Sequence, residues 1–196
     1  ATVKMLELIQ SGRIGDIITV KADFGFKADF DPEKRLFNKD LGGGALLDIG
    51  LYPVYLSLLL LGKPSDIKAT ARFSSTGADV STYMLFNYPD QAKAFLECSF
   101  ESNTPTEASI YGTKGQIKIH SRFHHSQKIS LNRYGEKEEI FEIPYSGNGY
   151  VHEIEHVHEC LNYNFSESPL LSHSISLVLA ETLDRVKNEI GLSYRD

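Results

Sequence analysis

The sequence has few of the cysteines that cross-link small secreted domains and no excess of the basic residues that bind nucleic acids. Among its 196 residues there are no tryptophans, two methionines and two cysteines, Cys98 and Cys160. No CxxC pair occurs, so a disulfide-rich scaffold is excluded and both thiols are expected to be reduced and partly buried. Basic residues are outnumbered, 20 against 26 acidic ones, and the net charge of −6 argues against a nucleic-acid surface.

Long apolar segments are also missing. The longest uncharged run after Asp48, IGLYPVYLSLLLLG, has 14 residues and contains a proline. A helix that crosses a bilayer needs about 20 apolar residues, so this run is too short. Ala1 leads into an amphipathic stretch with Lys4 and Glu7, which is not the pattern of a signal peptide. We therefore expect a cytoplasmic protein that does not bind a membrane.

What the sequence does contain is the element order of an α+β domain. Apolar spacing predicts a helix from Thr2 that stops at Gly12, a strand over 16–26, and a helix over 45–61 that ends at Gly62. Period-two patterns and turn residues then predict further strands, and two helices close the chain. These strands are expected at 66–75, 79–88, 92–101, 106–112, 115–120, 127–133 and 137–143, and the helices at 150–163 and 172–190.

This order predicts a largely antiparallel, open-faced β-sheet with helices packed on one face. In the strand AKAFLECSF, apolar residues or the thiol occupy alternate positions and would face the helices. The other face would carry Phe95 beside Lys93 and Glu97. Such a mixed, uncovered face is typical of an interface, so we expect a homo-oligomer, a dimer or larger, built through the open face of the sheet.

The first motif that carries chemistry is GGGALLDIGLYP. Gly42, Gly43 and Gly44 precede a helix, and Asp48 and Tyr52 share one face of it, about one turn apart. Glycine allows a backbone to approach a ligand closely, and the first N–H groups of a helix can bind an anion or a polar ligand. The alternative is a plain turn, an aspartate that caps a backbone, and a tyrosine in the core.

The second motif, HEIEH, fits the zinc-protease pattern H-E-x-x-H. His152 and His156 would bind zinc, Glu153 would act as general base, and Glu181 would be the third ligand. The alternative is an amphipathic helix with exposed His and Glu side chains and no metal. His124 and His125, which lie between two predicted strands, are interpreted as surface residues.

The glycine motif and its flanks point to one family. The segment PEKRLFNKDLGGGALLDIGLYPV (32–54) resembles the glucose–fructose oxidoreductase and inositol dehydrogenase family, called GFO/IDH/MocA, and its dihydrodiol and xylose dehydrogenase branch. ELIQSGRIGDI, IYGTKGQIKI, ESPLL and LDRVKNEIGLSY match as well, so the resemblance runs along the chain. It implies two domains: an N-terminal Rossmann domain that binds NAD or NADP, and a C-terminal α+β domain.

The chain resembles the second domain alone. Residues 1–196 would form the C-terminal substrate-binding and oligomerisation domain, and the N-terminal Rossmann domain would be absent. No G-x-G-x-x-G follows a predicted strand, and the family's Glu-Lys-Pro motif with its catalytic lysine is missing. Glu33-Lys34 is followed by Arg35 and does not replace that motif. The cofactor, NAD or NADP, would be bound mainly by the missing domain, and this chain alone would be inactive.

The resemblance also assigns roles. Tyr52 would be the acid/base group, with Asp48 orienting the substrate hydroxyl. A free phenol has a pKa of about 10, and the lysine of the other domain would lower it. The substrate would be a small sugar, polyol or diol, and no residue would bind a metal ion. A zinc-dependent hydrolase and a non-catalytic assembly module remain the alternatives. Further cleft residues would be Gly42, Gly43, Gly44, Arg35, Phe37, Tyr150 and His156.

Overall fold

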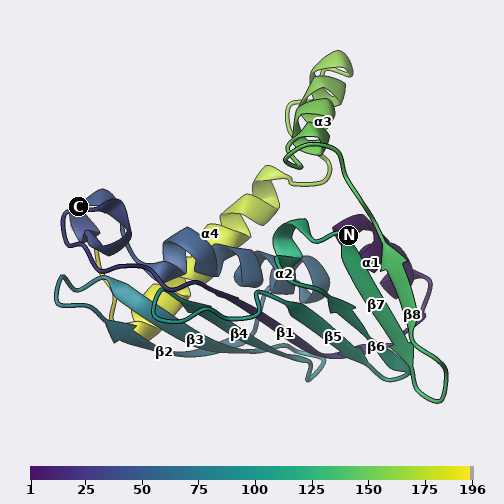
Figure 1. The fold of residues 1–196 in the computed structure, drawn as a ribbon, viewed down its shortest axis with the longest axis horizontal. Helices are drawn as coiled ribbons and strands as arrows, with labels where there is room; N and C mark the ends of the chain where they lie inside the picture. The colour runs from purple at the N-terminus through teal and green to yellow at the C-terminus, as the bar shows by residue number, and fades with distance from the viewer. Residues whose placement is uncertain (195–196) are drawn as a thin grey trace.

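The computed structural model describes residues 1–194 and contains one eight-stranded β-sheet with helices on one side of it (Figure 1). The predicted α+β class with an open, largely antiparallel sheet is confirmed. The strands are β1 (Ile17–Gly25), β2 (Asp66–Phe73), β3 (Asp79–Asn87), β4 (Lys93–Ser99), β5 (Ala108–Gly112), β6 (Gly115–Ile119), β7 (Lys128–Arg133) and β8 (Glu139–Glu142). The helices are α1 (Thr2–Gln10), α2 (Leu51–Leu61), α3 (Val151–Asn162) and α4 (His173–Ile190), with short helical turns η1 (Arg35–Phe37), η2 (Lys39–Leu41), η3 (Leu46–Gly50) and η4 (Phe123–His125).

β1 departs from a simple meander. The strand order is β2-β3-β4-β1-β5-β6-β7-β8, so β1 lies between two strands that follow it far downstream. Val20 of β1 faces Ala94 of β4 in parallel pairing and Ile110 of β5 in antiparallel pairing. Turn signals predict only the pairing of strands that are neighbours in the sequence, whereas a parallel pair needs a long crossover. Here α2, β2 and β3 form that crossover.

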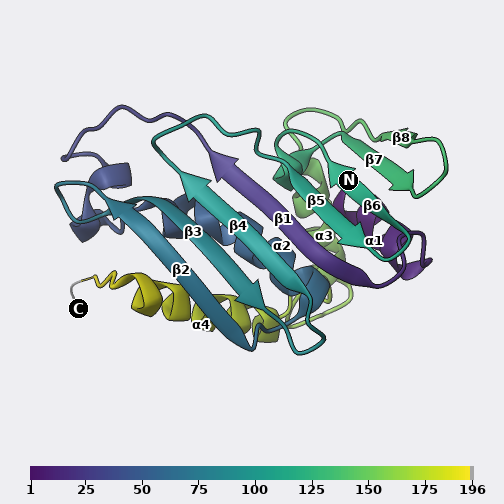
Figure 2. The same cartoon turned by 90° about the horizontal axis from the view of Figure 1, so that it is seen from below.

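The two faces of the sheet differ as the alternation in β4 predicts. Ala94, Leu96 and Cys98 are buried under the helices, whereas Phe95 is exposed on the opposite face. Figure 2 shows that opposite face from below, with no helix in front of the strands. The core therefore lies in a single layer between the sheet and its helices, and the second face of the sheet is uncovered.

α2 and α4 cover the sheet. α2 packs on α4, β1 and β4, and α4 packs along β2. The helical stretch Lys39–Leu61 is long and apolar enough to cross a membrane by composition alone, and 56% of its most apolar window is buried inside the fold. Its apolar character is accounted for by this packing, because a helix surrounded by protein is apolar on all sides.

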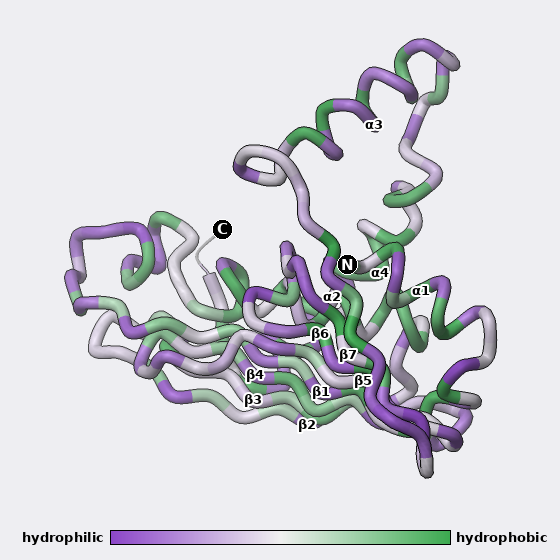
Figure 3. The backbone as a smooth tube through the Cα atoms, turned by 45° about the vertical axis from the view of Figure 1, so that its right-hand side comes forward, coloured by the Kyte–Doolittle hydropathy of each residue, from purple (hydrophilic) through white to green (hydrophobic). Residues whose placement is uncertain are grey.

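α3 is the exception among the helices. It stands away from the sheet on two connecting segments, and we call residues 144–172 the arm (Figure 1). No residue of α3 is buried, although Ile154, Val157 and Leu161 recur at the spacing of one helical face. Figure 3 shows hydrophobic and hydrophilic residues alternating along α3. The sequence predicts helices packed on the sheet, and α3 does not pack there within residues 1–194.

Candidate functional site

The glycine triplet forms a tight turn at the start of the helix that carries the first motif. Gly42 adopts a left-handed conformation, φ +72°, at the end of η2. Gly43 and Gly44 are buried, and a Cβ would overlap the Arg35 carbonyl oxygen at the first position and the Asp79 carboxylate at the second. The turn and the close packing therefore both require glycine. A role of the triplet in a substrate cleft stays a prediction.

Asp79 of β3 occupies the start of that helix. Its Oδ2 accepts hydrogen bonds from the Leu46 N–H at 2.7 Å and from the Thr82 hydroxyl at 2.8 Å. Its Oδ1 is buried without a hydrogen-bond partner in residues 1–194, and burial raises the pKa of the Asp79 carboxyl. The Leu46 N–H is therefore already used by a protein carboxylate, and binding of an anion or a polar ligand at this helix start stays a prediction.

Asp48 lies in η3, a π-helical turn that replaces the regular helix predicted from residue 45. The Arg35 guanidinium Nη2 lies 2.6 Å from Asp48 Oδ1, and the aspartate side chain keeps 20% of its surface exposed. The structure thus brings together two of the predicted site residues. π-turns are rare and frequently occur at functional sites. This one brings Gly50 so close to β4 that a Cβ would lie 2.8 Å from Cys98 Sγ.

Tyr52 lies in the first turn of α2 and is 39% exposed, so its ring is not sealed in the core. It forms part of the wall of a cavity of about 350 Å³, between α2, η4 and the start of α4. The ring of Phe24, from β1, packs on it with ring centres 5.4 Å apart. The lining is mainly apolar and consists of Thr2, Leu51, Tyr52, Tyr55, Leu56, Leu59, Ile119, Phe123, His124, Leu171, Ser176 and Leu179.

His124 is a residue of this cavity that the sequence analysis misses. It was interpreted as a surface residue, but its ring is half-buried, 5.1 Å from the Tyr52 ring and stacked on Phe24 at 4.7 Å. Burial, with the nearby charges of His125 and Arg122, lowers the pKa of His124 to about 4. The apolar Phe123 beside it is the sequence feature that could have indicated this burial. Phe123 is buried in the short turn η4, so the neighbouring histidine also lies against the core.

Phe37 does not line the Tyr52 cavity. It is buried in an aromatic cluster, with ring centres 5.1 Å from Phe30 and 5.8 Å from Phe100. It contributes instead to a separate cavity of about 310 Å³ beside β3 and the 26–30 segment. The sequence predicts that Phe37 and Arg35 line one cleft. The structure places Arg35 beside Asp48 and Phe37 in the separate aromatic cluster.

Tyr150 and His156 both lie on the arm. Tyr150 is exposed at the start of α3, and the structure does not bring it to the cavity. His156 Nε2 is 2.7 Å from the hydroxyl oxygen of Ser168, which ties α3 to the segment that returns toward α4. His156 therefore has a structural partner, and its role in a substrate cleft stays a prediction.

The HEIEH motif does not assemble a metal site in the described part of the chain. Within residues 1–194, no group of three His, Cys, Asp or Glu side chains is placed to hold a metal ion. His152 is exposed on α3, and Glu181, the third ligand of the zinc hypothesis, lies on α4 and pairs with Lys63. The geometry favours the alternative of an exposed amphipathic helix.

Comparison with known families decides the relationship. The GFO/IDH/MocA C-terminal domain profile matches residues 2–118 of the chain. The chain belongs to this family. Trans-1,2-dihydrobenzene-1,2-diol dehydrogenases are among its relatives: the Xenopus tropicalis protein is 34% identical over 95% of the chain, and the Mus musculus protein is 33% identical over 96%. The GFO/IDH/MocA chain spans 58% of the length of these two relatives.

Solved structures share the fold of the GFO/IDH/MocA chain. An aldose-aldose oxidoreductase from Caulobacter crescentus, complexed with glycerol, superposes with a TM-score of 0.83 at 21% identity, covering 95% of this chain and 57% of that one. A 3-ketoreductase from Actinomadura kijaniata, complexed with NADP and TDP-benzene, gives 0.79 at 23% identity, covering 96% and 58%. At this level of identity the likeness shows the fold.

A dinucleotide cofactor does not fit the residues of this chain by itself. Pyrophosphate binding in a Rossmann unit needs a glycine-rich turn between a strand and the free start of a helix. The Gly42–Gly44 turn is the nearest equivalent here. However, the Asp79 side chain already accepts the Leu46 N–H at the start of the following helix, where the pyrophosphate would have to bind. The described residues thus form a cavity beside Tyr52 and no pyrophosphate site of the Rossmann type.

Proposed function

We propose that this GFO/IDH/MocA chain is the substrate-binding half of an NAD(P)-dependent oxidoreductase. Its reaction transfers a hydride between the carbinol of a sugar, polyol or diol and the nicotinamide ring. The observation that carries the proposal is Tyr52, a partly exposed phenol in the wall of a cavity of about 350 Å³, one turn after an ion-paired aspartate. The names of the relatives, dehydrogenases of a benzene dihydrodiol, support this class of substrate.

The cofactor site belongs, in this proposal, to an N-terminal nucleotide-binding domain of the full-length protein. The match of this chain to only 58% of its relatives' length supports a second domain. The absence of a glycine-rich pyrophosphate turn in the described residues supports the same division of labour. When bound, NAD or NADP accepts or donates the hydride, and the protein positions the substrate and handles the proton.

The residues of this chain supply the proton-handling half. The phenolate form of Tyr52 accepts the proton of the substrate hydroxyl in oxidation and becomes the phenol, and the phenol returns that proton in reduction. Asp48 does not line the cavity; it lies one turn before Tyr52, and its ion pair with Arg35 at 2.6 Å would fix the start of the helix that positions the phenol. The apolar side chains of Leu51, Leu56 and their neighbours keep water out of the cavity, which strengthens the polar contacts inside it.

The test is the Tyr52→Phe variant of the full-length protein. Oxidation of diols, sugars and polyols is followed by the absorbance of the reduced cofactor. The variant loses the group that moves the proton, so kcat should fall by about 10²–10⁴-fold. Cofactor affinity, measured by fluorescence titration with NADPH and NADH, should stay unchanged because the ring and its packing are kept.

Tyr134→Phe is the control, because it removes an equally simple phenol that is exposed and lies outside the cavity. It should keep the kcat of the wild type. A Tyr52→Phe variant with near-normal kcat would remove Tyr52 from the mechanism. A wild-type protein that binds cofactor but oxidises none of these substrates would support the non-catalytic assembly module.

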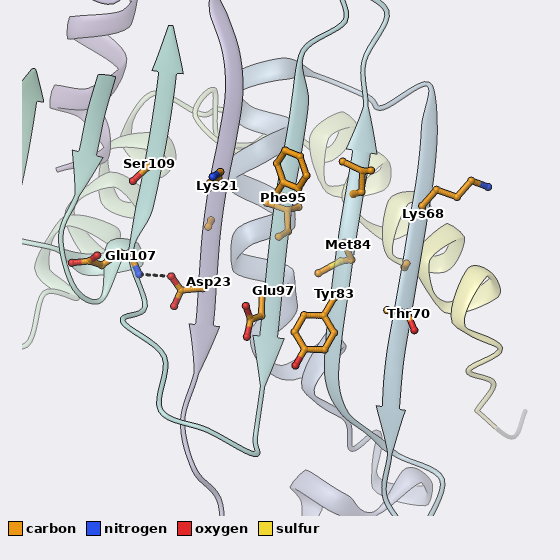
Figure 4. A pocket seen from close by; sticks show the side chains of 14 residues that line it. Lys21, Asp23, Lys68, Thr70, Tyr83, Met84, Phe95, Glu97, Glu107 and Ser109 are labelled. Carbon is orange, nitrogen blue, oxygen red and sulfur yellow. Dashed lines mark hydrogen bonds between the residues drawn. The ribbon is translucent and has the colours of Figure 1, made fainter. Parts of the chain in front are cut away.

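We also propose that two copies of the chain associate through the open face of the sheet. Phe95 and Tyr83 are exposed there, and Lys21, Lys68 and Glu97 surround them (Figure 4). A two-fold axis places the same patch on both copies, so a face that carries both signs of charge can complement itself. Phe95→Glu puts an unpaired charge at the centre of this patch and should shift the full-length protein to the monomer in light scattering.

The control for that experiment is Val3→Glu, which adds the same charge at an exposed position on α1. It should leave the oligomeric state unchanged. An unchanged oligomer in Phe95→Glu, or a wild type that is monomeric at high concentration, would contradict association through this face.

A further inference from the structure

The segment between β6 and β7 holds one histidine against the candidate site. Arg122 adopts a left-handed conformation, φ +60°, and starts the short turn η4. The buried Phe123 anchors this turn in the core. The His124 ring is thereby laid nearly parallel to Phe24, with an interplanar angle of 11° and ring centres 4.7 Å apart. Its orientation is fixed by packing on two sides.

His124 makes no hydrogen bond within residues 1–194, and its Nδ1 is buried without a partner. The two histidines nearest to it in the sequence behave differently. His125 Nδ1 lies 2.8 Å from the Tyr145 hydroxyl oxygen, and His120 Nε2 lies 2.8 Å from the Ser130 hydroxyl oxygen. Because Nδ1 has no accessible surface, a molecule in the cavity cannot reach it; Nε2, which has no hydrogen-bond partner within residues 1–194 and is not buried, is the nitrogen that such a molecule can meet.

The charge state of His124 restricts what that ligand is. With its pKa lowered to about 4, the imidazole is neutral at physiological pH. In a neutral imidazole Nε2 is either a donor or an acceptor, according to the tautomer, and a hydroxyl group fits both cases because it donates and accepts. It lacks the positive charge that would attract a carboxylate or a phosphate. The other charged groups in contact with it, His125 and Arg122, lie in the same turn.

The other residues that line the cavity restrict the chemical class of the ligand further. No Lys, Arg, Asp or Glu is among the residues that line it, and leucines from α2 and α4 form much of the wall. The polar groups besides His124 are the hydroxyls of Tyr52, Tyr55, Thr2 and Ser176. An uncharged molecule with hydroxyl groups on one side and an apolar ring on the other satisfies both parts of this lining.

We propose that His124 is a substrate-binding residue, which holds a second hydroxyl group of the substrate while Tyr52 handles the reacting one. The two rings, 5.1 Å apart, lie within the span of one small molecule with adjacent hydroxyl groups. His124 then selects vicinal diols with an apolar ring over simple alcohols. This inference rests on the proposed function, because it assumes that Tyr52 meets the reacting carbinol.

The test compares trans-cyclohexane-1,2-diol with cyclohexanol in the full-length protein. His124→Phe keeps the stacking on Phe24 and removes both nitrogens. A hydrogen bond of about 1–3 kcal/mol then disappears for the diol, so kcat/KM for the diol should fall at least about 10-fold more than for cyclohexanol. His124→Gln, which keeps one donor and one acceptor, should restore part of the preference for the diol.

The outcomes separate this inference from the proposed function. Equal losses for both alcohols in His124→Phe, or no loss for the diol, overturn the role of His124 while a sensitive Tyr52→Phe variant still supports the oxidoreductase. A wild type that oxidises neither alcohol overturns both. A ¹⁵N NMR titration of His124 gives an independent check, since an imidazole that protonates near neutral pH would contradict a neutral hydroxyl partner.

Discussion

Two segments of the chain present ionisable side chains one helical turn apart, and the fold treats them in opposite ways. Asp48 and Tyr52 lie where α2 meets the sheet, and their neighbours Arg35, Phe24 and His124 come from three other elements, η1, β1 and η4. His152 and His156 lie on the arm, where α3 buries none of its residues. The spacing is the same in both motifs, but only the first meets side chains from distant parts of the chain.

The difference shows what a residue pattern needs in order to become a site. α2 is apolar on all sides and α3 has one apolar side, and both motifs carry groups that suit proton transfer or metal binding. Packing against β1 and η4 surrounds Tyr52 with a cavity and a second polar ring. α3 has only its own connecting segments beside it, so its histidines stay in solvent or bind locally.

The largest expected contrast is in stability. Leu46→Ala removes a fully buried side chain from η3, the turn that precedes α2, and should lower the free energy of unfolding by about 2–5 kcal/mol. Leu161→Ala makes the same chemical change on the arm, where the leucine is 66% exposed. It should alter the stability by less than about 0.5 kcal/mol. Urea denaturation of this chain, followed by far-UV circular dichroism, compares the two; similar losses would place α3 in the cooperative core.

Glycine substitution should give the next contrast. In Gly44→Ala, a Cβ at φ +132° overlaps the Asp79 carboxylate, so strain and displacement should cost about 2–4 kcal/mol. Gly147→Ala, in the segment that leads to the arm, has φ +64° and no neighbour within 4 Å. Its cost should stay below about 1 kcal/mol, because the arm can adjust locally. Equal midpoints in thermal unfolding would show that the triplet turn is not under steric constraint.

Asp79, which accepts the Leu46 N–H at the start of η3, makes the stability of the protein depend on pH. Burial raises the pKa of Asp79 in the folded protein above the unfolded value of 3.8, so the folded state holds this proton more tightly. Stability from this group is therefore present below pH 3.8 and is lost as the pH rises through the folded pKa. Asp79→Asn keeps an acceptor for the Leu46 N–H and removes the titration.

The free energy of unfolding of Asp79→Asn, relative to wild type, should thus increase between pH 4 and pH 8, by about 1.4 kcal/mol for each unit by which the pKa is raised. Asp79→Ala, which removes the cap itself, should be less stable than Asp79→Asn at every pH. Denaturation curves at several pH values give both comparisons. A constant difference between Asp79→Asn and wild type across this range would contradict a buried ionisable cap.

The smallest effect should come from the arm histidines. His152→Ala removes an exposed imidazole, and it should leave both the stability and the metal content unchanged. Elemental analysis of the purified protein should find no zinc above the level of a buffer blank. One equivalent of zinc that is lost in His152→Ala would reverse the comparison, because the arm would then hold the site.

Much of this fold is predictable from local patterns. The alternation in β4 fixes which side faces the helices, since a strand shows successive residues to opposite faces. Leu46 and its neighbours are recognisable as core because they form a dense apolar run. The position of β1 is not predictable in this way, because its partners in β4 and β5 are set by tertiary packing and not by any turn beside it.

The candidate site was predictable only in part. Its glycine and Asp–Tyr spacing identifies the segment, but the π-turn and the close approach of Gly50 to Cys98 of β4 are not encoded by any local pattern. The reason for Gly44 lies in Asp79, far downstream on β3. The burial of His124 depends on Phe24, which is distant in the sequence and comes from β1, so the local sequence predicts only a loop residue.

The insertion of β1 also bears on how the protein is made. During synthesis, residues 17–25 leave the ribosome well before the strands that flank them, β4 and β5. Until those strands appear, the segment IITVKADFG has no pairing partner, and its apolar side chains remain open to contact with other nascent chains. Closing the sheet around it joins residues distant in sequence, which is a slow step. Chaperone dependence during translation is therefore the expected cost of a sheet whose central strand is made first.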